Sequence, residues 1–145
     1  MLRKKVWVEG NLDSAQYQRI LSDIVFPALD AHLGAGCWVW TQDGAPSHTS
    51  NSTQTFLLNR LGSKGFWSKD FWPPSSPNLN PLDYHMWTGV EEVACAKAHS
   101  NVNALKASVV SAWDAMPPKT LEKACRSFRP RIEACIAAEG NIFEK

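Results

Sequence analysis

The chain has 145 residues, 44% of them hydrophobic and 20% charged, which is the composition of a folded globular domain and excludes a disordered chain. A formal net charge of +1 excludes the strong overall field of a highly basic nucleic-acid binder. The length predicts one domain with a sizeable core, in which about 70% of the unfolded surface is removed from water.

At the N-terminal end, a short extended segment is predicted to lead into a long helix. Residues 6–8, Val-Trp-Val, are a β-favouring run and predict a strand. Asp13 or Ser14 can cap the helix that follows, whose apolar residues recur every three or four positions. Pro27 kinks or restarts this helix, and Gly34 with Gly36 ends it.

The middle of the chain is predicted to hold a second strand, a loop and a helix. Residues 37–42 are mainly aromatic and β-branched, and they end at Asp43, the first residue of the loop. A carboxylate then lies at the C-terminal end of a strand, where ligands gather in open α/β sheets. Ser47 or Thr49 can start the next helix, which Gly62 closes.

A third strand candidate, residues 66–72, precedes a proline-rich segment, residues 73–81, which we expect to be extended and rigid. Asp83 follows directly, in the first turn of a predicted helix. Further helices are predicted over residues 101–116, 118–128 and 129–138.

Asp43 and Asp83 are the candidates for chemistry, and 39 residues separate them. Two carboxylates delivered from separate elements suit a pair of Mg²⁺ ions, since Mg²⁺ prefers oxygen ligands. Two such ions stabilise the attacking and leaving oxygens of an in-line phosphoryl displacement, as in nucleases. An aspartate at a helix start is more often a cap that interacts with the helix dipole, and pattern alone favours that reading.

Two segments resemble the Tc1/mariner transposases. Residues 40–50, Trp-Thr-Gln-Asp-Gly-Ala-Pro-Ser-His-Thr-Ser, resemble the segment around the second catalytic aspartate of that family. Residues 72–84, Trp-Pro-Pro-Ser-Ser-Pro-Asn-Leu-Asn-Pro-Leu-Asp-Tyr, resemble its proline-rich arm and third carboxylate. The two motifs occur in the family's order and spacing. The resemblance extends from about Val6 to Lys145, more loosely in the C-terminal helices.

The resemblance implies an α/β fold of the ribonuclease-H-like class, a mixed sheet flanked by helices, with extra C-terminal helices. Residues 1–96 would be a partial catalytic domain, and residues 97–145 a helical extension of the same domain. Asp43 and Asp83 would be catalytic residues and ligands of Mg²⁺ or Mn²⁺ in a two-ion site. The first carboxylate would lie on the first strand of this fold, whereas residues 6–8 correspond to the third. We therefore expect an N-terminally truncated chain that lacks the first two strands and the first aspartate, and that is inactive by itself.

Other residues have supporting roles in this interpretation. His48 holds the loop or approaches a DNA phosphate, and Glu91 and Glu92 are fallback ligands whose alternative role is solvated helix charge. Non-specific contacts to DNA phosphates are expected from basic residues that otherwise are simply solvated: Lys64, Lys69, Arg126, Arg129 and Arg131.

The expected partner is DNA, with a homodimer as in related transposases and no small-molecule substrate. No apolar run approaches the roughly 18 residues of a membrane span, and the N-terminal run is too short for a secretory signal. The four cysteines lack the spacing of a zinc or redox motif. We expect an intracellular protein, nuclear if its source is eukaryotic, with no membrane partner. The alternative function is a non-enzymatic transposon remnant that serves as a DNA- or protein-interaction module.

Overall fold

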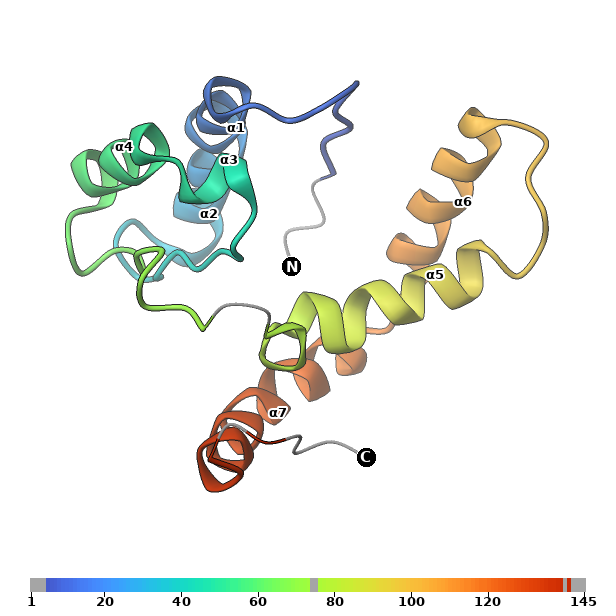
Figure 1. The fold of residues 1–145 in the computed structure, drawn as a ribbon. Coiled ribbons are helices and arrows are strands. Elements are labelled where there is room, and N and C mark those ends of the chain that lie inside the picture. Colours follow the sequence, from blue (N-terminus) through green and yellow to red (C-terminus); the bar gives the residue numbers. More distant parts are fainter. Residues whose placement is uncertain (1–4, 74–75, 140, 142–145) are drawn as a thin grey trace. The chain divides into compact units, whose positions relative to one another are not determined.

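The computed structural model describes residues 5–73, 76–139 and 141 (Figure 1). The chain divides into two compact units, Met1–Ser75 and Ser76–Lys145, and the position of one relative to the other is not determined. Pro74 and Ser75 of the predicted proline-rich arm lie outside the described residues. The division into a partial catalytic domain, residues 1–96, and a helical extension of it, residues 97–145, stays a prediction.

The first unit begins with a long helix in three parts. α1 (Ser14–Ile20), the π-helical segment η1 (Leu21–Val25) and α2 (Phe26–Leu33) follow one another in helical backbone geometry. Asp13 is the cap, because its carboxylate accepts the Gln16 N–H at 2.7 Å. The wider π segment directly precedes the turn of Pro27, which lacks an N–H, so the predicted kink takes the form of a π segment. Gly34, with φ 90°, ends the helix as predicted.

Two shorter helices follow, α3 (Pro46–Thr49) and α4 (Asn51–Leu61). The predicted start of the next long helix at Ser47 or Thr49 is wrong, because both residues lie inside α3. Ser50 leaves helical geometry, and its hydroxyl accepts the Thr53 N–H at 3.2 Å, which caps α4. Gly62, with φ 69°, ends α4 as predicted.

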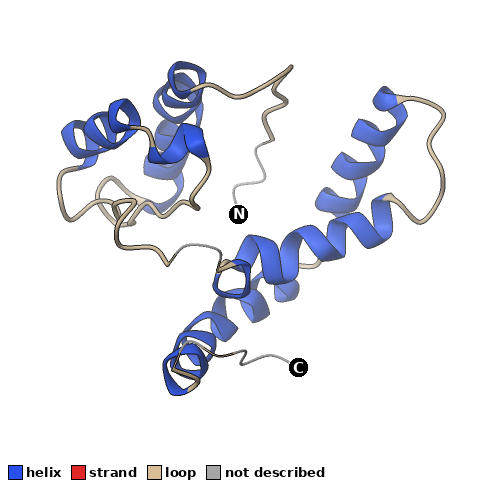
Figure 2. Ribbon diagram, viewed as in Figure 1, coloured by secondary structure: helices blue, strands red, loops and turns tan. Residues whose placement is uncertain are grey.

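The predicted mixed sheet is not present in the described residues, where Figure 2 shows helices and loops. The β pairing found there is an isolated parallel bridge between Trp40 and Phe66. In it, the Trp40 N–H donates to Gly65 O and the Trp67 N–H donates to Trp40 O, each at 2.9 Å. β-favouring side chains form strands only where neighbouring strands supply backbone partners and packing, and one pair is marginal by itself. The prediction of strands over residues 6–8, 37–42 and 66–72 from side-chain type was therefore wrong.

Aromatic side chains dominate the core of the first unit. The ring of Phe26 is fully buried, and its centroid lies 5.4 Å from that of Trp38, 5.5 Å from that of Trp40 and 6.3 Å from that of Phe56. α2, α4 and the extended segment before Asp43 thus pack around one ring. This packing fixes the extended segment without a sheet. Buried together with Phe26 are Tyr17, Leu21, Leu57 and Phe66.

The described residues of the second unit form helices and connecting loops. They contain the 3-10 turn η2 (Pro77–Leu79), the π-helical η3 (Leu82–Trp87), α5 (Thr88–Ala94), α6 (Val102–Ala115) and α7 (Pro118–Ala137). The proline-rich arm, predicted to be extended, enters this unit through the 3-10 turn, since proline fits the first turn of a helix. The helices predicted over residues 118–128 and 129–138 are one helix, α7. Pro130 lies inside it on the exposed surface, where it removes one hydrogen bond without ending the helix.

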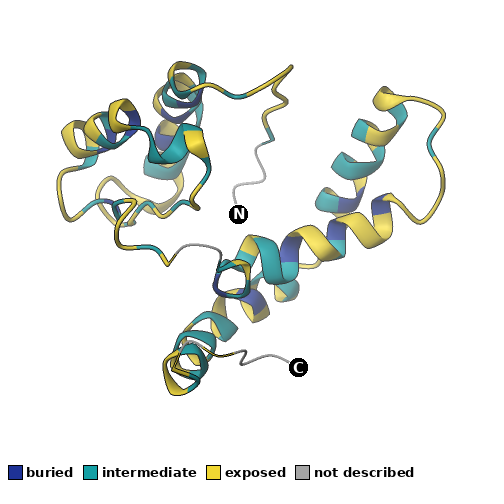
Figure 3. Cartoon of the chain, viewed as in Figure 1, coloured by how far each residue is buried: buried dark blue, intermediate teal, exposed yellow. Residues whose placement is uncertain are grey.

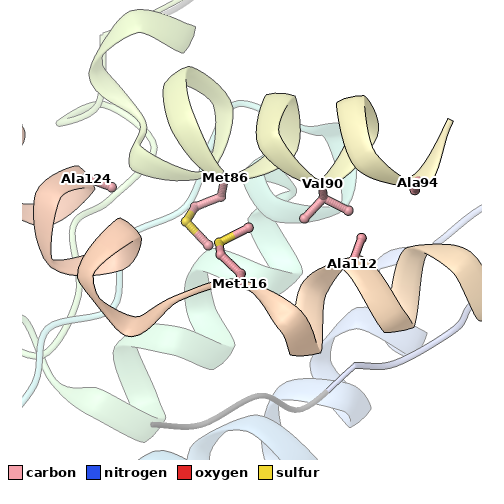
Figure 4. Close-up of a cluster of buried hydrophobic side chains, with 6 residues drawn as sticks. All are labelled: Met86, Val90, Ala94, Ala112, Met116 and Ala124. Carbon is pink, nitrogen blue, oxygen red and sulfur yellow. The ribbon is translucent and has the colours of Figure 1, made fainter. Parts of the chain in front are cut away.

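The core of the second unit lies where its helices meet (Figure 4). Met86, Val90 and Ala94 recur every four residues along η3 and α5, so they share one face. Ala112 of α6 lies opposite, and Figure 4 shows the side chains of Met86 and Met116 pointing toward each other. Small alanines let the helices approach closely, while the flexible methionines fill the remaining space.

Buried residues lie mainly in narrow stripes on the helices (Figure 3), and Phe66 and Met116 are buried outside them. Several large apolar side chains are exposed, among them Val93 at 63%, Val102 at 65% and Ile136 at 70%. In the described part of the chain, every helix is too short or too polar to cross a membrane.

Candidate metal-binding site

Asp43 begins the loop after the extended segment, and two groups fix one oxygen of its carboxylate. Its Oδ1 accepts the Ala45 N–H at 3.1 Å and lies 2.6 Å from Nδ1 of His48. An ionised carboxylate can only accept, so Nδ1 of His48 carries the proton in this contact. Within the described residues no hydrogen bond reaches Oδ2, and the Asp43 side chain is 50% exposed. Asp43 thus has one oxygen held in place and the other open.

His48 is held against the body of the first unit. Its side chain is 19% exposed, and its ring centroid lies 4.3 Å from that of Tyr17. Its carbonyl accepts hydrogen bonds from the side-chain amides of Gln42 at 2.9 Å and Gln54 at 3.0 Å. Of the two roles predicted for His48, these contacts are those of a residue that supports the loop.

Gln42, directly before the aspartate, connects the parts of this site. Its Oε1 accepts from the Tyr17 hydroxyl at 3.0 Å and from Trp40 Nε1 at 3.1 Å, while its Nε2 donates to His48 O. Burial raises the pKa of Tyr17, and the nearby Asp43 carboxylate raises it further, so the phenol stays neutral and donates. Sequence reasoning missed Gln42, Tyr17 and Gln54. For Gln42, its place next to a candidate aspartate was the available signal.

Asp83 lies in the first turn of η3, which confirms its predicted place at a helix start. Asn80 shapes this turn: its carbonyl accepts the N–H groups of Asp83 at 2.9 Å and Tyr84 at 3.0 Å, and its Oδ1 accepts the Leu82 N–H at 3.1 Å. Within the described residues, no hydrogen bond or ion pair reaches the Asp83 carboxylate. The carboxylate is therefore available to a ligand.

Arg131 of α7 supports the segment that carries Asp83. Its Nη1 donates to Asn78 O at 3.0 Å, and its guanidinium lies 4.0 Å from the centroid of the Tyr84 ring. The Tyr84 hydroxyl in turn donates to Ala124 O at 2.5 Å. Arg131 was predicted to contact DNA, whereas here its side chain fastens the segment around Asp83 to α7.

The fallback ligands lie at the surface of α5. Glu91 and Glu92 are both exposed, beyond the turn that holds Asp83. Across residues 5–73 and 76–139, no three His, Cys, Asp or Glu side chains are grouped so that they could hold a metal ion. Asp43 belongs to the first unit and Asp83 to the second, so their pairing in one metal site is a matter for proposal.

The other basic residues predicted to contact DNA are exposed. On α7, Arg126 and Arg129 each pair with a glutamate four residues away, at 2.7 Å and 2.8 Å. Exposed pairs of this kind contribute about 0–1 kcal/mol, so a phosphate can replace the glutamate at little cost. Lys64 and Lys69 are exposed in the first unit.

The fold is that of a transposase catalytic domain. The chain is similar to the Mos1 transposase catalytic domain solved with raltegravir and manganese, with a TM-score of 0.77 and 20% identity over 93% of this chain and 67% of that chain. The Mos1 transposase paired-end complex with left transposon end gives a TM-score of 0.78 and 22% identity, over 93% of this chain and 38% of that chain. At such identities the likeness establishes the fold alone.

No protein-family model matches the chain. The Tcb1 transposase of Caenorhabditis briggsae is 32% identical to it over 133 residues, which are 92% of this chain and 46% of the relative. The chain is homologous to the Tc1/mariner transposases, which confirms the resemblance carried by the two motifs. It spans about half the length of this relative.

Proposed function

We propose that residues 1–145 are part of a ribonuclease-H-like DDE transposase catalytic domain, in which Asp43 and Asp83 bind a divalent metal ion for phosphoryl transfer on DNA. Homology to the Tc1/mariner transposases supports this function. The observation that carries it is the Asp43 carboxylate, half exposed, with Oδ1 fixed by two donors and Oδ2 open. Asp83 supplies a second carboxylate without a side-chain partner among the described residues.

The residues fit Mg²⁺ or Mn²⁺. Mg²⁺ keeps several waters and is usually bound by one or two carboxylates together with substrate phosphates. Asp43 and Asp83 supply this kind and number of donors, and the Mos1 catalytic domain was solved with manganese. For a complete two-ion site we propose a further carboxylate that is not among residues 1–145.

The proposed mechanism assigns separate tasks to the residues of the first unit. When bound, metal ions stabilise the attacking and leaving oxygens of an in-line displacement at phosphorus. Asp43 binds through its open oxygen, and the hydrogen bonds from Ala45 and His48 keep its carboxylate from rotating. Gln42 joins this loop to the rings of Tyr17 and Trp40, so the carboxylate is held on the core of the unit.

Residues 1–145 by themselves are proposed not to cleave DNA. Two carboxylates leave one ion incompletely coordinated, which weakens both metal binding and the alignment of the attacking water. Incubation of a supercoiled plasmid with the chain and Mg²⁺ or Mn²⁺ should therefore yield no nicked circles. Nicking that Asp43→Ala abolishes would show a complete site and overturn this part of the proposal.

DNA is the proposed partner of this chain, since the Mos1 transposase forms a paired-end complex with the left transposon end. We assign phosphate contacts to the exposed Lys64, Lys69, Arg126 and Arg129, which makes binding non-specific and sensitive to salt. We also propose that the chain forms a homodimer, as in related transposases, and that it acts in the nucleus if its source is eukaryotic.

Calorimetric titration with Mn²⁺ tests the proposed function. Residues 1–145 should bind Mn²⁺, and binding should be lost in Asp43→Asn and Asp83→Asn, which keep the side-chain size and remove the charge. Asp23→Asn is the matched control, because Asp23 is exposed on η1, and it should bind as the unmodified chain does. Binding indifferent to both site substitutions would favour the alternative of a non-enzymatic DNA- or protein-interaction module.

A further inference from the structure

We propose that His48 is a positioning residue for Asp43, whose ring donates from Nδ1 and holds the carboxylate in the orientation that presents Oδ2 to a metal ion. This inference rests on the proposed function, because it assigns the neighbour that keeps a metal-binding carboxylate in place. It gives His48 a role that acts through Asp43, without contact to DNA or to the reacting atoms.

Asp43 needs such a neighbour, because it lies at the start of a loop and is half exposed. The N–H of Ala45, at 3.1 Å, restrains Oδ1 alone and leaves the carboxylate able to turn about that contact. His48 lies in α3, five residues further along the chain, and its Nδ1 reaches the same oxygen at 2.6 Å. A short contact to an ionised oxygen is among the stronger hydrogen bonds in proteins. The two donors together define which oxygen is occupied and which remains open.

The donor can fix the carboxylate because the donor is itself held. One face of the His48 ring lies against Tyr17, with centroids 4.3 Å apart, and the side chain is 19% exposed. The amides of Gln42 and Gln54 both donate to its carbonyl. The ring therefore cannot follow the carboxylate if Asp43 turns, and it offers little surface to a DNA phosphate.

The choice of ring nitrogen provides a sharp test. An asparagine amide can place its nitrogen near the position of Nδ1, whereas a glutamine amide lies one methylene further out, near the position of Nε2. His48→Asn can therefore restore the donor to Asp43, while His48→Gln carries the same amide in the wrong place. Because neither amide is an imidazole, recovery in His48→Asn also excludes the ring as a metal ligand.

The experiment measures Mn²⁺ affinity of residues 1–145 by electron paramagnetic resonance of the free ion, with thermal unfolding recorded for each variant. Groups that hydrogen-bond a metal ligand typically change metal affinity by about 10- to 100-fold. We expect His48→Ala and His48→Gln to weaken Mn²⁺ binding by about that factor, and His48→Asn to retain most of it. His32→Ala, an exposed histidine on α2, is the control and should bind as the unmodified chain does.

The outcomes separate this inference from the proposed function. If Asp43→Asn abolishes Mn²⁺ binding but His48→Gln leaves it unchanged, His48 does not position the carboxylate and the inference fails alone. Equal weakening in His48→Asn and His48→Gln would also refute it, because the donor position would then not matter. If Asp43→Asn leaves binding unchanged, or the unmodified chain binds no Mn²⁺, the proposed function fails and this inference with it. Should His48→Ala not fold, the comparison of asparagine with glutamine decides.

Discussion

Replacing Gln42 with alanine is expected to destabilise the first unit strongly, although Gln42 belongs to a loop region. Its Oε1 accepts from Tyr17 at 3.0 Å and from Trp40 at 3.1 Å. In Gln42→Ala both ring donors lose this acceptor, whereas His48 O keeps the Gln54 amide at 3.0 Å. The substitution therefore leaves two part-buried donors unpaired.

A buried donor without an acceptor costs about 1–3 kcal/mol of stability. Because both donors are only part-buried, water can reach them, and we expect Gln42→Ala to lower the free energy of unfolding by about 2–4 kcal/mol in total. The whole free energy of unfolding of a small domain is about 5–15 kcal/mol, so this loss is a large fraction. Urea unfolding followed by tryptophan fluorescence measures it, because the midpoint falls in proportion to the lost free energy.

Gln18→Ala is the matched control for this prediction. The Gln18 amide contacts the hydroxyls of Ser52 and Thr53 at 3.3 Å each, near the surface, and its removal should cost no more than about 0.5 kcal/mol. Tyr17→Phe combined with Gln42→Ala should cost less than the sum of the two, because both remove the same hydrogen bond. An unfolding free energy for Gln42→Ala within about 0.5 kcal/mol of the unmodified chain would refute the reasoning.

Three further predictions concern single residues. Burial raises the pKa of Tyr17 in the folded chain, so as the pH rises the unfolded chain loses the phenol proton first. The stability that the neutral phenol contributes is therefore complete below about pH 10. Above that pH, the free energy of unfolding falls by up to about 1.4 kcal/mol per pH unit. Urea unfolding at about pH 9 and about pH 11 should show this fall, and Tyr17→Phe should reduce it. Arg131→Ala should lower the unfolding free energy by about 1–2 kcal/mol, since it loses a hydrogen bond and a cation–π contact. Arg126→Ala, which loses only an exposed ion pair, should stay within about 0.5 kcal/mol of the unmodified chain, and urea unfolding measures both variants. Pro130→Ala should raise the unfolding free energy by about 1–3 kcal/mol by restoring a hydrogen bond inside α7, and an unchanged or lower midpoint would contradict this.

Features set by short-range chemistry could be predicted from the sequence. Gly34 and Gly62 end their helices with positive φ, which glycine adopts without strain. Asp13 caps α1 through a contact three residues away. Asp83 lies in the first turn of its helix, directly after a proline-rich segment whose geometry excludes a continuous helix.

Features set by long-range contacts could not be predicted in this way. The extended segments hold suitable side chains, yet strands need backbone partners, and in the described residues Trp40 finds such a partner in Phe66 through one bridge. The role of Gln42 depends on Tyr17, 25 residues earlier, which only the packing of α1 against the loop brings near. Two helices were predicted over residues 118–128 and 129–138, but the chain forms one helix of 20 residues there, in which the exposed Pro130 removes too little to end it.

The central proposal is that Asp43 and Asp83 both act as ligands of a divalent metal ion. Paramagnetic Mn²⁺ weakens the nuclear magnetic resonance signals of nearby amides, so a titration of isotope-labelled residues 1–145 reports which residues lie close to a bound ion. We predict that the amide signals of Gly44 and Tyr84 weaken together at the same Mn²⁺ concentration. In Asp83→Asn, both signals should keep their intensity at that concentration. Two results would contradict the account. One is that Mn²⁺ weakens only one of the two signals, and the other is that Asp83→Asn restores the Tyr84 signal but not the Gly44 signal.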